Sequence, residues 1–451
     1  MKFKSILLIN PIPKSFTSIN KDLNGGYGTR DEIGKNILSK VISYAKKRNI
    51  KIPVLCMGYI SAILNSKKIK NYYFENCENV ISFLKNNKAN CCVLYGSIVC
   101  CDLENKIINE IKKINKKIKI IVVGTYPAKF PEKFFNADHI IIGEPENFFL
   151  NWDGDINSLN SLGKKINSEF IKNLDILPIP HYPKQFSKKF SYRPMLKSPT
   201  GFIESTRGCP FSCGFYCTYG ENQGKLIRSY SPEFVVNMMK TLILKNGFRS
   251  FQFRDPVFGL EKDFFEKFCM EIHKKGLRIQ WGIETRIDTL NIEIIRLMAS
   301  AGLKSINIGI ETPNEKIAKA NKRVICQEDK QRELIQAASK LGVKINAFYI
   351  LGLEEDNYIS SLETINYALS LNTFMARFAV CTPYPGTGFY DVLLKEGRIN
   401  EVNLDKYNQQ ELVYKHKYLN RKKIKELTQK AYIKYYLRPK IIFNILKDKF
   451  S

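Results

Sequence analysis

The chain has 451 residues, enough for two or three domains with substantial cores, and its 71 basic and 43 acidic residues give a formal net charge of +28. The lysines are spread over the whole sequence without an arm of interleaved aromatic residues, so nucleic-acid binding is not predicted. No apolar run is long enough to span a membrane, and no secretory signal peptide is expected. Several of the twelve cysteines lie in apolar runs, which is typical of reduced thiols and favours a cytoplasmic location.

Short apolar runs alternate with amphipathic stretches over residues 1–150. Strands are predicted at 4–10, 50–56, 91–95, 118–123 and 139–142, which together indicate an open, Rossmann-like parallel sheet. Ligands of such sheets bind at the carboxyl ends of the strands. The candidate binding residues at those ends are Asn10, Gly96, Ser97, Gly124, Thr125, Gly143 and Glu144. The strand-to-helix turns alone also explain the glycines.

Residues 151–200 are predicted to be a linker between two domains. The first part is polar and has no sustained period, and the segment 174–183 is rich in proline, which excludes a helix and favours an extended strap.

Three cysteines, Cys209, Cys213 and Cys217, lie within nine residues directly after an apolar run. Three thiolates from one loop can hold a [4Fe–4S] cluster and leave its fourth iron open for a small molecule. Zinc is the alternative, but it normally needs a fourth Cys or His, and the four histidines are all distant in sequence. A zinc-stabilised RNA-binding protein without catalysis therefore remains the alternative from another functional class.

Six strand–helix units follow in residues 201–390 and predict a partial (βα)6 barrel, with strands at 201–203, 250–254, 278–284, 304–310, 344–351 and 375–382. Residues 391–451 are predicted to be a helical C-terminal region. The chemistry of a parallel barrel lies at the carboxyl ends of its strands. Polar residues occur there, namely Asp255, Glu284, Arg286 and Glu311, although each of them can also be explained as structural.

The cysteine loop resembles the signature loop of radical S-adenosylmethionine (SAM) enzymes. The usual spacing in that family is C-x3-C-x2-C, and this chain has C-x3-C-x3-C, one residue longer. The blocks that begin at Asp255, Trp281, Ile306 and Thr382 also resemble the family's pattern. The resemblance implies a [4Fe–4S] cluster on the three cysteines, which are the catalytic and metal-ligating residues, and SAM contacts from Tyr216, Asp255, Glu284, Arg286 and Glu311.

The runs ILLINP, LYGSIVCCD, IIVVGTYPAKFPE and DHIIIGEPE resemble the cobalamin-binding domain that precedes many radical SAM cores. The resemblance implies cobalamin as a further cofactor. The D-x-H-x-x-G motif is missing, so the expected cobalamin is base-off and has no histidine ligand from that motif.

The resemblance implies a cobalamin-dependent methyltransferase. SAM would be cleaved reductively, the resulting 5′-deoxyadenosyl radical would take hydrogen from an unactivated carbon of a small molecule, and methylcobalamin would then deliver the methyl group. Ring formation or rearrangement of the substrate is the alternative within the family. The expected partners are the small-molecule substrate and an external flavodoxin- or ferredoxin-like electron donor, and the chain is expected to be a monomer.

Overall fold

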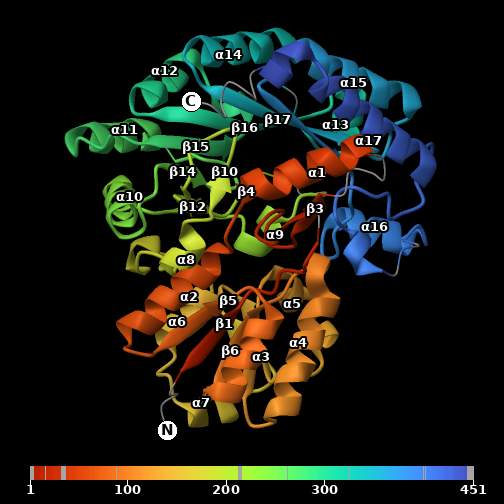
Figure 1. The fold of residues 1–451 in the computed structure, drawn as a ribbon. Coiled ribbons are helices and arrows are strands. Elements are labelled where there is room, and N and C mark those ends of the chain that lie inside the picture. The colour runs from red at the N-terminus through yellow and green to blue at the C-terminus, as the bar shows by residue number, and fades with distance from the viewer. Residues whose placement is uncertain are drawn as a thin grey trace.

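We describe a computed structural model of the chain that covers residues 5–15, 17–31, 37–87, 89–211, 216–261, 263–324, 326–399, 401 and 403–443. The chain forms two parallel six-stranded sheets, which occupy the lower and upper halves of Figure 1, with helices on their outer faces. The predicted fold class is confirmed: an α/β chain with an open parallel sheet, then a partial (βα)6 barrel and a helical C-terminal tail.

The first sheet has the strand order β5-β1-β6-β7-β8-β9, and every neighbouring pair is parallel. In β1, Ile6 and Leu8 join the core under α2 and α6, whereas Leu7 and Ile9 join the core under α3 and α4. Both faces are buried, which explains the continuous apolar runs. The elements are β1 (Ile6–Ile9), α2 (Leu55–Ser66), β5 (Asn71–Phe74), α3 (Cys77–Asn86), β6 (Cys91–Tyr95), α4 (Cys101–Ile114), β7 (Lys119–Val123), α5 (Thr125–Lys129), β8 (His139–Gly143), α6 (Pro145–Asn151), α7 (Ile156–Asn160) and β9 (Lys165–Ser168).

The predicted strand at 50–56 is wrong. Only β4 (Ile50–Lys51) is extended there, and it pairs antiparallel with β10 (Ser191–Tyr192) rather than joining the sheet. Pro53 interrupts the apolar run, and α2 begins two residues later, at Leu55. The strand that completes this edge of the sheet is β5, whose partly exposed sequence Asn-Tyr-Tyr-Phe lacks the apolar pattern of a central strand.

The second sheet runs in chain order β11-β14-β15-β16-β17-β18, again with parallel pairs throughout. Strands β11 and β18 are its two edges, so the barrel is partial. The elements are β11 (Thr200–Ile203), α10 (Pro232–Asn246), β14 (Ser250–Phe253), α11 (Phe264–Lys274), β15 (Gln280–Thr285), α12 (Ile292–Ser300), β16 (Leu303–Glu311), α13 (Glu315–Ala320), α14 (Glu328–Lys340), β17 (Lys344–Leu351), α15 (Tyr358–Leu371) and β18 (Met375–Val380).

The connection from β1 to α2 is far longer than the few residues usual in βα units. We call residues 10–54 the N-terminal excursion. It contains β2 (Ser18–Asn20), β3 (Thr29–Asp31), α1 (Ile37–Asn49) and β4. Figure 1 shows α1 in the upper half of the molecule beside α17 (Arg421–Tyr436), and Lys46 lies over the ring of Tyr432, 4.8 Å from its centroid. The excursion therefore starts in the first sheet and packs against the barrel.

The segments between and after the sheets also pack on them. The predicted linker supplies β9 to the first sheet and also contains α8 (Lys184–Ser187) and β10. Beyond the barrel follow α16 (Gly388–Lys395) and α17. Within the described ranges, each helix is too short or too polar to cross a lipid bilayer.

A buried ion-pair cluster joins the two halves. Arg207, at the end of β12 (Thr206–Arg207), lies 2.6 Å from Glu204 and 3.0 Å from Glu146 in α6. Glu144, which follows β8, lies 3.5 Å from Arg207 and 2.8 Å from Arg228 in β13 (Arg228–Ser229). All five side chains are at most 9% exposed. Because charges without partners are costly in such surroundings, this cluster fixes how the first sheet meets the barrel.

Arg207→Met should destabilise the protein by about 3–5 kcal/mol, because it leaves buried carboxylates without their shared cation. Urea unfolding measures the loss. Arg296→Met, at an exposed position on α12, is the matched control and should change the free energy of unfolding by less than about 0.5 kcal/mol. An equally stable Arg207→Met protein would contradict the structural role given to the cluster.

Candidate active site

The cysteine loop leaves the end of the first barrel strand and is held by its own backbone. The N–H of Cys209 donates to the carbonyl of Gly224 at 3.0 Å. Gly208 before it has a φ of 92°, and a Cβ there would overlap the carbonyl oxygen of Leu226. Cys209 is buried and Cys217 is half-buried, and both line a cavity of about 290 Å³ inside the barrel. Cys213 lies outside the described residues.

Asp255 holds the chain where it enters this loop. Its Oδ1 accepts hydrogen bonds from the backbone N–H and hydroxyl of both Ser205 and Thr206. Burial raises the pKa of Asp255 to about 6, against the lowering effect of these hydrogen bonds. Asp255 is not among the residues that line the cavity, so the structure brings it to the base of the loop rather than to the open space.

Glu284, Arg286 and Tyr216 all line the barrel cavity. The Glu284 carboxylate pairs with Arg254 and accepts from Asn307 at 3.4 Å, and burial raises its pKa. Arg286 pairs with Asp288 at 2.6 Å, and its guanidinium lies 4.1 Å from the ring centroid of Phe211 in the cysteine loop. These contacts keep the end of β15 against the loop.

Glu311 also lines the cavity, at the end of β16, in a left-handed conformation with a φ of 67°. The register between β16 and β17 shifts between Gly309 and Glu311, which is a local irregularity of the ladder. The carboxylate of Glu311 lies 3.3 Å from the guanidinium of Arg323. A non-glycine residue in this conformation costs free energy, and such residues cluster at functional sites.

The sequence reasoning missed several residues in the same cavity. Asn307 and Asn346 stand in register on β16 and β17, and their side chains are joined by a 3.2 Å hydrogen bond. Arg377 lies on β18, and Lys46 reaches the cavity from the N-terminal excursion. A polar residue in an apolar strand run, such as Arg377 in Met-Ala-Arg-Phe-Ala-Val, was the available signal. Nothing local in the sequence indicates that Lys46 crosses to the barrel.

A second cavity, of about 310 Å³, separates the first sheet from the barrel. Four of the seven residues predicted at the strand ends line it, namely Gly124, Thr125, Gly143 and Glu144. Tyr219, at the start of α9 (Tyr219–Gln223), lines both this cavity and the barrel cavity. The cavities are therefore neighbours on either side of the segment that follows Cys217.

The other three predicted residues do not reach this cavity. The N–H and hydroxyl of Ser97 donate to Glu104, which forms a buried ion pair with Lys21 at 2.7 Å. A Cβ on Gly96 would collide with Pro127 and Phe134, so close packing explains that glycine. Asn10 donates to the hydroxyl of Tyr73 at 3.1 Å. The strand order reverses between β1 and β6, and a ligand was expected in the crevice at their carboxyl ends. Lys21 of the excursion lies there instead, paired with Glu104.

The same excursion narrows the second cavity. Thr125 donates to the carbonyl of Gly25 at 2.6 Å, and the hydroxyl of Tyr95 donates to the carbonyl of Gly26 at 3.2 Å. A volume of about 310 Å³ is at the lower end for small-molecule sites, and a corrin is larger than most of their ligands. The four histidines, all within the described ranges, are not among the residues that line this cavity.

Asp22 faces the second cavity, and its hydrogen bond among the described residues is a weak one, from the N–H of Leu55 at 3.4 Å. Burial raises the pKa of this carboxyl from 3.8 to about 7, although the nearby Arg254 acts in the opposite direction. The group therefore exchanges a proton near neutral pH.

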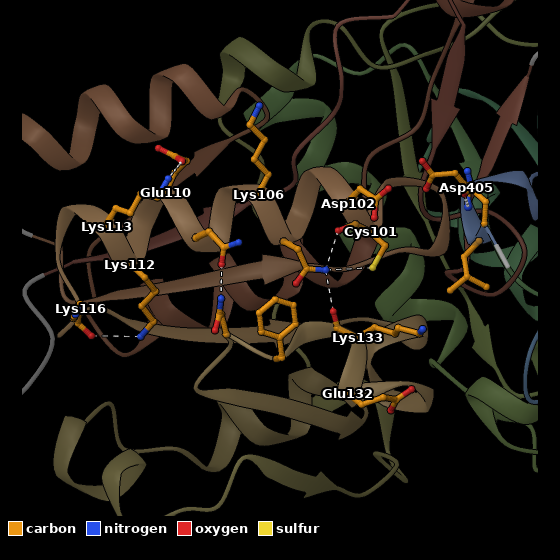
Figure 2. Close-up of a pocket in the computed structure, with 16 residues that line it drawn as sticks. Cys101, Asp102, Lys106, Glu110, Lys112, Lys113, Lys116, Glu132, Lys133 and Asp405 are labelled. Atoms are coloured by element: carbon orange, nitrogen blue, oxygen red, sulfur yellow. Dashed lines mark hydrogen bonds and ion pairs between the residues drawn. The ribbon is translucent and has the colours of Figure 1, made fainter.

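A third hollow, of about 1,300 Å³ and larger than these two cavities, lies elsewhere. It is an open groove along α4, shown in Figure 2, where Lys106, Lys112 and Lys113 stand on the helix and Lys133 faces it. Glu110 pairs with Lys113 at 2.8 Å, so part of the charge is compensated. The two described cysteines of the loop, Cys209 and Cys217, do not line this groove. Its lysines lie at the surface and do not converge on a buried point, as the groups of a reaction site do.

Comparison with known proteins agrees with the barrel cavity as the active site. The sequence model of the radical SAM superfamily matches residues 203–368. These residues form a radical SAM domain. The match covers the cysteine loop, β14, β15 and β16, which carry the predicted SAM contacts, and a radical SAM domain implies a [4Fe–4S] cluster and SAM as cofactors.

Named relatives of this radical SAM enzyme extend the likeness beyond the barrel. The chain is 28% identical to an uncharacterized methyltransferase of Pyrococcus horikoshii over 75% of this chain and 76% of that protein. It is 25% identical to the anaerobic magnesium-protoporphyrin IX monomethyl ester cyclase of Rubrivivax gelatinosus over 87% of this chain and 73% of that protein. The solved structure of the cobalamin-dependent SAM radical enzyme OxsB, with aqua-cobalamin and SAM bound, has the same fold, with a TM-score of 0.68 at 14% identity over 99% of this chain and 70% of OxsB.

Asp22→Asn should stabilise this radical SAM enzyme, and more so at high pH. Between pH 3.8 and about 7 the folded protein holds a proton on Asp22 that the unfolded chain has lost, so the free energy of unfolding falls as pH rises through this window. The asparagine removes this penalty, which reaches at most about 4 kcal/mol above the folded pKa. Urea unfolding at about pH 5 and about pH 8.5 measures the difference.

Asp329→Asn, at an exposed position on α14, is the control and should not show this pH dependence. A gain for Asp22→Asn that is equal at both pH values would contradict the assignment.

Proposed function

We propose that this radical SAM enzyme is a cobalamin-dependent methyltransferase that acts on an unactivated carbon of a small molecule. The observation that carries the proposal is the adjacency of the two cavities, which share Tyr219 as a wall. A methyl donor on the first sheet and a radical formed beside the cysteines can meet one substrate only if their sites adjoin. Relatives that are named methyltransferases and the cobalamin-bound structure with the same fold support this choice.

Each cofactor has candidate residues in the chain. Cys209, Cys213 and Cys217 would hold the cluster, and the two described cysteines face the cavity where SAM would bind. When bound, the cluster supplies the electron that cleaves SAM and cobalamin supplies the methyl group. The protein's own contribution is to hold the loop through Asp255 and Arg207 and to enclose the reacting atoms away from water.

The residues at the strand ends suit SAM. Arg286 has a planar fork for the carboxylate of SAM, and Phe211 keeps this fork beside the loop. Tyr216, Glu284 and Glu311 offer an aromatic face and carboxylates to its adenosyl and amino groups. Asp255 acts as a positioning residue through Ser205 and Thr206, without direct contact to the cavity.

For cobalamin the fit requires a movement. Gly124, Thr125, Gly143 and Glu144 would face it across the second cavity, while the segment 23–28 occupies part of the space that a corrin needs. That segment is held by hydrogen bonds from both halves, among them Thr125 to Gly25 and Thr218 to Asn24, and by the buried ring of Tyr27, so bound cobalamin would have to compensate for the loss of these contacts. Asn10, Gly96 and Ser97 would not contact cobalamin and would instead stabilise the carboxyl ends of β1 and β6.

Ring formation is the second candidate, because one relative similar over most of the chain is named a cyclase. Both reactions would use the same radical and would differ in how the substrate radical is consumed. The proposal also includes the division of the chain into residues 1–150, 151–200, 201–390 and 391–451. It further includes a monomeric state, a cytoplasmic location and an external flavodoxin- or ferredoxin-like electron donor.

Cys217→Ala, like Cys213→Ala, should abolish 5′-deoxyadenosine formation from SAM under anaerobic reduction and lower the iron content, because two thiolates do not hold the cluster. Iron, sulfide and zinc analysis, together with chromatography of the nucleoside product, measures this. Cys77→Ala, on α3 of the first sheet, is the control and should retain both properties. Zinc in place of iron in the wild type would overturn the enzymatic function.

Cobalamin added to the anaerobic protein should bind base-off. Its Co(II) electron paramagnetic resonance spectrum should lack nitrogen splitting from a histidine, because no histidine lines the second cavity as described. Free base-on cobalamin provides the reference spectrum. Splitting from a protein nitrogen would contradict the assigned site, and absence of binding would favour a radical SAM reaction without methyl transfer from cobalt.

A further inference from the structure

Arg377 differs from the other cations of the barrel cavity. Lys46 has Asp31 at 3.5 Å, Arg286 has Asp288 at 2.6 Å and Arg323 has Glu311 at 3.3 Å. Among the described residues no carboxylate pairs with Arg377, whose guanidinium donates only to the side-chain oxygen of Gln409 at 3.1 Å. The Nε of Arg377 is buried and has no hydrogen-bond partner among the described residues. Glu284, in the same cavity, is near enough for Arg377 to lower its pKa, but its carboxylate pairs with Arg254. A half-buried guanidinium without a carboxylate in direct contact gains from a ligand that supplies one.

Neutral side chains from three distant segments hold this guanidinium in place. Gln409, in the C-terminal region, accepts from Arg377 and donates to Asn24 of the excursion at 3.0 Å. Asn24 in turn donates to Tyr384, after β18, at 2.8 Å. Both Gln409 and Asn24 have left-handed backbones, with φ values of 65° and 54°. Strained residues that orient a cation without neutralising it are expected where a ligand binds.

The strand that carries Arg377 separates it from the expected SAM site. Glu284 and Glu311, which are assigned to SAM, lie on β15 and β16, whereas β18 is the far edge of the sheet, two strands from β16. In the parallel register Arg377 is level with Phe348 and Gly309, so its separation from β16 runs across the sheet and is about 10 Å at about 4.8 Å per strand. Lys46 adds a second positive charge to this corner, and Asp31 is the carboxylate that accompanies it.

We infer that the substrate carries an oxyanion, a carboxylate or a phosphate, which binds Arg377 on the β18 side of the barrel cavity. The guanidinium fork matches the geometry of both groups. The inference deepens the proposed function, on which it rests for the location of SAM, and it defines the substrate class as a small anionic molecule. The reacting carbon would then lie between this anchor and the cysteine loop.

Inorganic phosphate and acetate are the probes, and the protein is the anaerobic, cluster-loaded full chain saturated with SAM, so that the carboxylate of SAM does not compete. The melting temperature is followed during titration with each anion, against chloride at matched ionic strength. The variants are Arg377→Met, which keeps the length and removes the charge, Arg377→Lys, which keeps the charge, and Arg332→Met. The last is the control, because Arg332 lies on α14 and pairs with Glu328.

At least one of the two anions should stabilise the wild type and the Arg332→Met protein. In Arg377→Met the apparent Kd of that anion should rise at least about tenfold, as expected for the loss of a charged hydrogen bond. Arg377→Lys should keep part of the stabilisation by the anion. In chloride alone Arg377→Met should melt at the same or a higher temperature than the wild type, because an uncompensated cation has been removed. The Kd for SAM should stay within about twofold.

Three results would overturn the inference. One is an unchanged anion response in Arg377→Met, or a wild type that responds to neither anion. Another is a lower melting temperature of Arg377→Met in chloride, which would make the guanidinium a structural group. The third is a loss of SAM affinity in that variant, which would assign Arg377 to SAM. Failure of the proposed function is distinguishable, since it would show as a wild type that does not cleave SAM.

Discussion

The buried guanidinium of Arg207 is the contact on which the arrangement of the enzyme depends. It stands two residues before Cys209 and pairs with Glu204 at the exit of the first barrel strand and with Glu144 and Glu146 beside the first sheet. The position of the cysteine loop is thus tied to the first sheet by charge, in surroundings where a mispaired charge costs several kcal/mol. A shift of one half against the other would break these pairs before it changed the cavities, so the adjacency of the two sites is a property of this cluster.

The N-terminal excursion is the second element that links the halves, and it does so with groups that serve both cavities. Lys21 closes the crevice between β1 and β6 through Glu104, Asp22 faces the second cavity, and Asn24 holds Gln409 and Tyr384 beside the barrel cavity. Three residues within a stretch of four therefore reach the edge of the first sheet, the proposed cobalamin space and the β18 side of the barrel. A ligand that moves the segment 23–28 necessarily acts on the hydrogen bonds around Arg377.

Local patterns were enough to predict the repeating part of the fold. The strand at 344–351 has the predicted bounds, because an apolar run between a helix-ending glycine and a turn has few alternatives. The edge strand β5 and the two-residue β4 were not predicted, since neither shows the apolar run of a strand covered on both faces. In the site, Glu284, Arg286 and Glu311 face the cavity as their positions at strand ends suggested. Ser97 and Asp255 instead hold chain segments, because their partners, Glu104 and Ser205, are chosen by packing that sequence spacing does not reveal.

Each cavity contains an ionisable side chain that has no ion-pair partner among the described residues. Asp22 is a carboxyl whose burial raises its pKa to about 7, and Arg377 is a cation whose guanidinium, within that part of the chain, donates only to the amide oxygen of Gln409. Each lowers stability, since a buried charge gains less from its surroundings than it loses in hydration. Apolar side chains at both positions would avoid this cost. Their presence on either side of Tyr219 is therefore best explained by ligands that complete the electrostatics of each cavity, a cofactor on one side and an anionic substrate on the other.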